Sequence, residues 1–507
     1  MDMNESLTSK TLHGLKWSYL STIVNAVLQI GFTAIMARLL EPAAFGLVVM
    51  AGIILRFGGY FAQMGVGPAL IQKAELTQKD IRAAFTASAL LGLAFSFLTY
   101  LLAPLALYIF DTPKVVPVVQ AMGFSFLLSG LSTTATSLLR RKLDFRSLAI
   151  IEVISYVFGY GLIGVLLASM GFGVWSLVVG SLSQAGLLTL LSYLFERHTV
   201  LASFHWKTHK RLISFGGRLS VISFFEFIGY NIDTLVIGRV WGANSLGVYT
   251  RSFAIVNLPT QYLAVTFSKV LFPSFSLVKS DIARLRRAYY SGLMLIAVVI
   301  MPISFGMIPA ARELVLTLLG SQWVSGIVIL QILAVLVPFI MGTILPAVVC
   351  DSTGRLNAKF FLQLSFVGLV ITLIATTYPY GVQVIAVMIV IANIIRFIAY
   401  QMLMRRMIAI SYTDILKAHV PGLLISAVVV SGIIISRWIL QNLPSGVLLL
   451  VEILVGGIIF SSFVLIKPPG LLKDVIRQTL IGLEGGTRAG WLDGRFMNWY
   501  RTRILCV

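Results

Sequence analysis

The 507-residue sequence has few charged residues. Only 11% of the residues are Asp, Glu, Lys or Arg, whereas 58% are hydrophobic and the mean hydropathy is +0.94. Soluble domains carry roughly 25% charged and 45–50% apolar residues, so this composition excludes a soluble globular protein and a disordered chain. Two cysteines are too few for a disulfide scaffold. Most of the chain is therefore expected to lie in lipid.

Motifs for ATP use and for hydrolysis are also missing. The sequence contains no Walker phosphate loop, no GxSxG motif and no HExxH motif. His198, His205 and His209 share one predicted loop, but no acidic or thiol partner accompanies them at ligand spacing. An ATP-driven pump in a single chain is excluded, and we predict no catalytic residue, no bound cofactor and no metal site.

Apolar stretches of about 20 residues bounded by charged residues predict fourteen membrane-spanning helices. They are placed at 15–37, 45–71, 84–108, 117–139, 148–168, 175–194, 214–238, 251–275, 289–311, 324–349, 359–376, 383–403, 418–437 and 445–466. The segment before the first span has no small-residue cleavage site, so that span is predicted to be an uncleaved anchor. The fold class is an all-α integral membrane protein.

Lys and Arg are distributed unevenly between the two sides of these predicted spans. Of the 39 basic residues, 29 lie in the termini and in the connections after even-numbered spans, and five lie in the connections after odd-numbered spans. Basic connections are retained in the cytoplasm, so both termini are predicted to be cytoplasmic. The excess of positive charge is a topology signal spread over short loops, which argues against nucleic-acid binding and favours contact with anionic lipid head groups.

The sequence contains an internal repeat. Residues 37–48 (ARLLEPAAFGLV) align with residues 238–249 (GRVWGANSLGVY), and an Arg and a Gly recur eight residues apart in both copies. The copies fall at the turn after span 1 and at the turn after span 7, as expected for a six-span unit used twice. Such parallel repeats are typical of alternating-access transporters.

The repeat gives a domain organisation of two six-helix lobes and an appended helix pair. The predicted parts are an N-terminal lobe at 1–194, a cytoplasmic linker at 195–213, a C-terminal lobe at 214–403, spans 13 and 14 at 404–466, and a cytoplasmic tail at 467–507. The tail, which begins PPGLLKDVIRQTLIGLEGG, is either a short amphipathic helix on the membrane surface or an unstructured polar tail.

Several phrases resemble a known family over almost the whole chain. They are LLRRKLDFRSLAIIEVISY at 138–156, GFGVWSLVVG at 171–180, GLKWSYLSTIVNAVLQIGFTAIMARLLEPAAFGL at 14–47 and DTLVIGRVWGANSLGVYTRS at 233–252. The sequence is similar to Wzx-type polysaccharide flippases, in the colanic-acid and teichuronic-acid exporter branch of the multidrug/oligosaccharidyl-lipid/polysaccharide superfamily.

That resemblance implies a definite function. The two lobes would form a V around a path for undecaprenyl-diphosphate-linked oligosaccharide repeat units, which move across the bacterial inner membrane for exopolysaccharide or lipopolysaccharide synthesis. No covalent bond changes, so the protein would not be an enzyme. The implied partners are the lipid-linked oligosaccharide, membrane lipids, and a polysaccharide polymerase and co-polymerase, and the transporter itself is expected to be a monomer.

Basic side chains within spans are the candidates for binding the diphosphate, because a buried anion needs a compensating charge. Arg56 is predicted near mid-membrane on span 2, and the resemblance places spans 1, 2, 7 and 8 around the cavity. Arg251 and Lys269 lie near the two ends of span 8, where snorkelling to an interface explains them equally well. Arg396 on span 12 is the fourth candidate.

Acidic residues within spans are rarer and include Glu152, Glu226, Asp233 and Glu452. Glu226 and Asp233 are seven residues apart and project from nearly the same face of span 7. A carboxylate in such a place can load H⁺ or Na⁺ as a coupling ion, or it can neutralise an intramembrane arginine. The sequence leaves both roles open.

Two other classes of function compete with the flippase. An ion-coupled exporter of small cationic drugs has the same architecture, but it favours acidic over basic residues in its cavity. A membrane polymerase or glycosyltransferase requires a sizeable external loop or a soluble catalytic segment, which the predicted short connections do not provide. The flippase is the preferred hypothesis, and the antiporter is the alternative.

Overall fold

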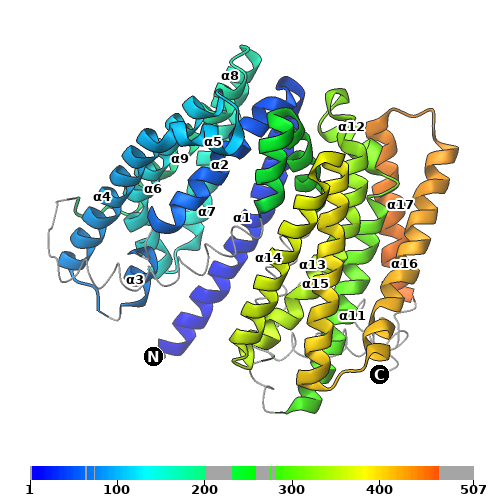
Figure 1. The fold of residues 1–507 in the computed structure, drawn as a ribbon. Helices are drawn as coiled ribbons and strands as arrows, with labels where there is room; N and C mark the ends of the chain where they lie inside the picture. The colour runs from blue at the N-terminus through cyan, green and yellow to red at the C-terminus, as the bar shows by residue number, and fades with distance from the viewer. Residues whose placement is uncertain are drawn as a thin grey trace. The chain divides into compact units, whose positions relative to one another are not determined.

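The computed structural model describes residues 3–62, 66–73, 75–200, 231–258, 275 and 281–466. Every regular element in these ranges is helical (Figure 1), as the sequence predicts. The chain divides into two compact units. The first consists of Met1–Thr250 together with Leu318–Gln322, and the second consists of Arg251–Thr317 together with Trp323–Val507.

The N-terminal part of the chain forms nine described α-helices and two shorter helical turns. Their bounds are α1 (Met3–Leu39), α2 (Pro42–Ala62), α3 (Val66–Gln72), α4 (Gln78–Leu102), η1 (Ala103–Leu105), α5 (Ala106–Phe110), α6 (Val115–Arg141), α7 (Phe145–Ser155), η2 (Tyr156–Ile163), α8 (Gly164–Ser169) and α9 (Val174–Phe195). Residues 231–258 are helical on both sides of Gly242, which has a φ of +74°. This left-handed conformation favours glycine.

The C-terminal part continues from residue 281. Its elements are α11 (Ile282–Gly306), α12 (Ala311–Leu318), η3 (Ser321–Trp323), α13 (Gly326–Ser352), α14 (Leu356–Thr377), η4 (Tyr378–Tyr380), α15 (Val382–Ile408), α16 (Tyr412–Ile439) and α17 (Ser445–Ile466). In Figure 1, α16 and α17 lie beside α11, and α13 lies beside α15.

Twelve of the described helical segments are long and apolar enough to cross a membrane. The predicted count of fourteen stays a prediction, because the predicted spans at 214–238 and 251–275 lie largely outside the described residues, as do the tail from residue 467 and most of the linker. The predicted span 45–71 is described as α2 and α3, and residues 63–65 between them lie outside the described residues.

Side-chain caps in the sequence begin several of these helices. The Thr77 hydroxyl accepts a hydrogen bond from the Asp80 amide, and the Asp80 carboxylate accepts one from the Thr77 amide, so this reciprocal capping box starts α4. Asp144, Asp281 and Ser411 cap α7, α11 and α16 in the same position. These caps satisfy amides that the helices themselves leave unpaired.

Small residues allow the helices of each unit to pack closely. In the first unit, Gly92 and Gly130 face the backbone carbonyls of Phe126 and Ser88, so α4 and α6 touch through their main chains. In the second unit, Gly422 of α16 faces the backbone carbonyl of Ala297 in α11. Close approach at small residues is how membrane helices gain packing energy without a hydrophobic driving force.

The predicted span 148–168 contains a local irregularity that the sequence did not predict. Its middle, η2, is a π-helix between α7 and α8. On η2 the Cα of Gly159 lies against the backbone of Gln184 in α9, and Gly161 lies against the ring of Phe32 in α1. The irregular turn thus lets one helix contact two neighbours through glycines.

Candidate functional site

Arg56 lies on α2 and its side chain is exposed. At 1.5 Å per residue it lies about 21 Å along the helix from Pro42 and about 9 Å from the end at Ala62. The preceding residue, Leu55, is buried against Phe126 of α6, so Arg56 projects from a different side of α2. No hydrogen bond or ion pair joins Arg56 to another residue within the described ranges.

The two copies of the internal repeat contact each other reciprocally. Gly46 of α2 lies against the backbone carbonyl of Ala243, and Gly247 lies against the backbone carbonyl of Pro42. Pro42 and Gly46 occupy the same repeat positions as Ala243 and Gly247. Both contacts fall within the first unit. A Cβ at either glycine would overlap main-chain atoms, which explains why glycine occupies this position in both copies.

Polar side chains donate hydrogen bonds to backbone carbonyls beside each copy of this repeat. The Gln322 side-chain amide donates to the carbonyls of Ala37 and Leu40, the latter at 3.0 Å, near the end of α1. Arg239, in the second copy, donates from Nη1 to the Leu107 carbonyl of α5 at 3.2 Å. Arg239 therefore joins the second repeat copy to α5. The Gln322 hydrogen bonds satisfy carbonyls at the end of α1, whereas the Leu107 carbonyl also accepts a hydrogen bond from the Asp111 amide.

Asp233 is held by hydrogen bonds from its own unit. The Tyr249 hydroxyl donates to Oδ2 at 2.6 Å, while the Thr234 amide and hydroxyl donate to Oδ1 at 2.7 and 3.2 Å. The Tyr249 side chain is only 2% exposed. Both carboxylate oxygens are thus satisfied without an ion pair to any described arginine. Glu226, its predicted companion, lies outside the described residues.

The other predicted cations have different environments. Arg251 is half-buried, and the next residue, Ser252, donates from its hydroxyl to the Gly326 carbonyl at the start of α13 at 3.1 Å. Arg396 is also half-buried. Its Nη2 donates to Gln363 Oε1 at 3.0 Å, and its guanidinium lies 4.6 Å from the centre of the Phe366 ring. Arg396 therefore joins α15 to α14.

Lys269, the fourth predicted cation, lies outside the described residues. Arg56 and Arg251 both lie on described helices. Arg56 belongs to the first unit and Arg251 to the second.

Sequence reasoning missed a polar pocket of about 600 Å³ at the ends of α6 and α9. Its wall contains an ion pair between Lys142 and Glu196, 2.6 Å apart, and the imidazole of His198, which packs edgewise on Tyr193. Burial lowers the pKa of His198. The pocket is lined by Leu76, Gln78, Ile81, Leu138, Arg141, Lys142, Glu196, Arg197, His198 and Thr199. Only the density of charge around 140–142 and 196–198 hinted at it in the sequence.

Sequence comparison finds a family model described as polysaccharide biosynthesis protein, which matches residues 35–328. Three curated relatives are similar to the chain. Lipopolysaccharide biosynthesis protein WzxC of Escherichia coli is 25% identical, covering 65% of this chain and 67% of its own length. Teichuronic acid biosynthesis protein TuaB of Bacillus subtilis is 24% identical, covering 65% and 68%. Succinoglycan biosynthesis transport protein ExoT of Rhizobium meliloti is 28% identical, covering 66% and 67%.

Two solved structures share the fold. A lipid II flippase, MurJ, in an inward closed conformation has a TM-score of 0.70 at 17% identity, and the match covers 92% of this chain and all of that one. An inward-facing MATE multidrug transporter of the MOP superfamily has a TM-score of 0.59 at 16% identity, covering 77% and 94%. These likenesses show that the chain shares the helical fold of these two proteins.

Proposed function

Because this chain belongs to the polysaccharide biosynthesis protein family, we propose that it flips undecaprenyl-diphosphate-linked oligosaccharide repeat units across the bacterial inner membrane. The family resemblance predicted from the sequence is confirmed. The names of the relatives place them in lipopolysaccharide, teichuronic acid and succinoglycan biosynthesis. A lipid-linked oligosaccharide is the common form in which such units are available at a membrane.

One observation carries the substrate assignment, namely the exposed guanidinium of Arg56 on the otherwise apolar helix α2. A charged side chain within a bilayer costs about 2.5–3.5 kcal/mol on insertion scales. That cost is offset when the side chain meets an anion, and a diphosphate offers several oxygens for charge-assisted hydrogen bonds. Arg56 is therefore the first diphosphate ligand in this proposal, with Arg251 and Lys269 as further ligands.

Arg396 has a weaker case as a diphosphate ligand. Its guanidinium already has Gln363 and the face of Phe366 as partners, so binding a diphosphate would require these contacts to be exchanged. It remains a secondary candidate, and the other three residues are the primary candidates.

The transport mechanism changes no covalent bond, so the protein acts as a transporter and not as an enzyme. Alternating access would carry the head group between leaflets while the polyprenyl chain stays in lipid. Asp233, with Glu226, is the proposed site for a coupling H⁺ or Na⁺. The hydrogen bond from Tyr249 would hold the Asp233 carboxylate in place during loading and release.

The orientation in this proposal follows the basic residues, with both termini and the polar pocket beside His198 on the cytoplasmic side. Substrate then enters from the leaflet where lipid-linked units are assembled and leaves on the periplasmic side. A polymerase and a co-polymerase would use the product there. The transporter functions as a monomer in this scheme.

The test measures which leaflet exposes a radiolabelled undecaprenyl-diphosphate oligosaccharide in inverted vesicles at matched protein levels. Arg56→Ala should slow translocation by about 10- to 100-fold, because a hydrogen bond to a charged group contributes about 1.5–3 kcal/mol. Arg406→Ala, at the exposed end of α15, is the matched control and should leave the rate unchanged. Full activity of Arg56→Ala would remove Arg56 from the mechanism.

The antiporter alternative is tested in the same vesicles. If the wild type moves no lipid-linked oligosaccharide but expels a fluorescent organic cation against an imposed ion gradient, the flippase proposal fails. A wild type that moves the oligosaccharide and ignores the cation excludes the antiporter.

A further inference from the structure

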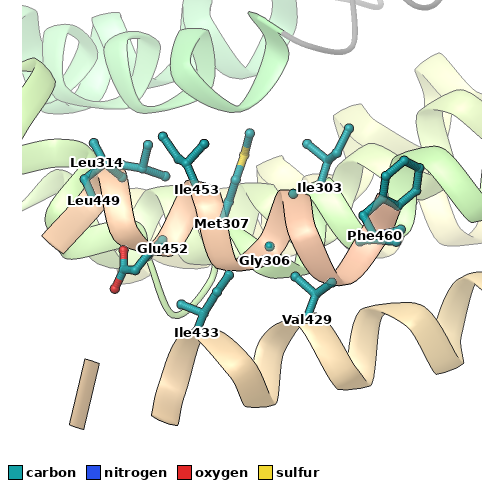
Figure 2. Close-up of a pocket in the computed structure, with 14 residues that line it drawn as sticks. Ile303, Gly306, Met307, Leu314, Val429, Ile433, Leu449, Glu452, Ile453 and Phe460 are labelled. Carbon is teal, nitrogen blue, oxygen red and sulfur yellow. The ribbon is translucent and has the colours of Figure 1, made fainter. Parts of the chain in front are cut away.

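The helices α11, α12, α16 and α17 of the second unit enclose a pocket of about 360 Å³ (Figure 2). Its wall is nearly all hydrocarbon, with Ile303, Val429, Ile453 and Phe460 among the labelled side chains. Glu452 of α17 is the one acidic residue among the side chains labelled there. A carboxyl group in such a wall requires an explanation.

Glu452 is almost fully buried, with 2% of its surface exposed. Neither carboxylate oxygen has a hydrogen-bond partner among the described residues, and no ion pair joins it to them. A buried carboxylate that lacks both is strongly disfavoured, because transfer from water removes its hydration without replacement. The Glu452 carboxylate must therefore bind a cation from outside the protein or become neutral by binding a proton.

The charged neighbours come from α12 and α16. Glu313 of α12 is 3% exposed, and its Oε1 lies 3.3 Å from Nη2 of Arg437 on α16. Arg437 also donates from Nη1 to the Pro309 carbonyl at 2.9 Å. Leu314, the residue after Glu313, lines the same pocket as Glu452.

The buried carboxylates at this site outnumber the arginine that is paired with them. The charged side chains at this end of the described parts of α11, α12, α16 and α17 are Arg312, Glu313, Arg437 and Glu452, and Arg312 is exposed. Two buried carboxylates thus share one arginine, which is already bonded to Glu313. One further positive charge is needed at Glu452.

We propose that Glu452 is a proton-binding site, which takes one proton from water onto a carboxylate oxygen and is held as the neutral acid in this arrangement. A bound metal cation does not fit, because hard cations require several oxygen ligands, and the remaining pocket wall supplies hydrocarbon. A proton needs a single oxygen. The site is separate from Arg56 and from Asp233, so it does not depend on the proposed substrate or on its path.

Protonation is linked to helix packing at this site. Gly432 of α16 meets the side chain of Ile459 on α17, and Gly456 of α17 meets the side chain of Val429 on α16, so the two helices pack closely one turn along α17 from Glu452. Loss of the proton leaves a negative charge that only water or Arg437 can reach. Deprotonation therefore requires α17 to loosen or Arg437 to leave Glu313.

The test is infrared difference spectroscopy of the purified full-length protein in lipid, near neutral pH and in light and heavy water. Wild type minus Glu452→Gln should show one protonated-carboxyl stretching band that shifts on deuteration. Asp351→Asn is the control, because Asp351 is paired with Lys359 at 2.8 Å on other helices, and it should keep the band. Absence of this band from the difference spectrum would overturn the proposal.

A second variant distinguishes the proposed arrangement from a merely buried carboxyl. Glu313→Gln releases Arg437, which can then pair with Glu452 and displace its proton, so the acid band should weaken or disappear. If the band keeps its full intensity in Glu313→Gln, Arg437 does not compete for Glu452, and the linkage to the ion pair is refuted. Intact monomers of both variants on size-exclusion chromatography establish that the spectra report folded protein.

Discussion

Substitution of Gly46 by alanine tests the reciprocal contact between the two repeat copies. The added Cβ would overlap the carbonyl of Ala243, so the two backbones would have to separate by roughly 1–2 Å to restore an ordinary contact of about 3.5 Å. Overpacking of this kind costs about 1–3 kcal/mol. The upper end applies here, because the opposing atom belongs to the backbone and cannot swing aside.

Gly52 on the same helix provides the control. Nothing lies within 4 Å of a Cβ built there, so Gly52→Ala should raise the free energy of unfolding by about 0.5–1 kcal/mol, the ordinary gain for alanine over glycine in a helix. The assay is reversible unfolding in mixed micelles, followed by tryptophan fluorescence. The two variants should differ by about 2–4 kcal/mol. Equal stability of Gly46→Ala and Gly52→Ala would refute the close approach.

Three further substitutions can be tested in the same assay. Tyr249→Phe should lower the free energy of unfolding by about 1–3 kcal/mol, because the half-buried Asp233 carboxylate loses a hydrogen bond. Arg437→Gln should lower the free energy of unfolding by about 1–3 kcal/mol. This loss is below the range for fully buried pairs because the Arg437 side chain is 35% exposed. Adding Glu313→Gln to this variant should recover part of the lost stability. Burial lowers the pKa of His198 in the folded protein, so the unfolded chain binds a proton at His198 more readily. The free energy of unfolding should therefore fall as the pH drops from about 7 to about 5. His198→Gln should reduce that fall. An unchanged pH profile in that variant would show that His198 is not responsible.

The helices were predictable because long apolar segments and their charged boundaries are read directly from the chain. The span predicted at 445–466 coincides with α17. The π-helix in η2 was missed because hydropathy does not distinguish a π-helix from an α-helix, and only the contacts of Gly159 and Gly161 explain it.

Site residues were less predictable than helices. Sequence reasoning could select Arg56, because a charge inside an apolar helix stands out, but it could not find the partners that define the roles of Asp233 or Arg396. Tyr249 reaches Asp233 from the other side of Gly242, and Gln363 reaches Arg396 from a different helix. Such pairs depend on the geometry of the turn and on which faces of two helices are in contact. Neither can be predicted from the local sequence pattern of a single helix.

The backbone contact between α4 and α6 constrains how the first unit can move. With Gly92 and Gly130 seated on main-chain carbonyls of the opposing helix, a slide of one helix by a single residue would bring bulkier side chains onto those carbonyls. The two helices therefore move together as a rigid pair. We expect any bending of this unit during a transport cycle to occur at the connections between helices and at the π-helix η2.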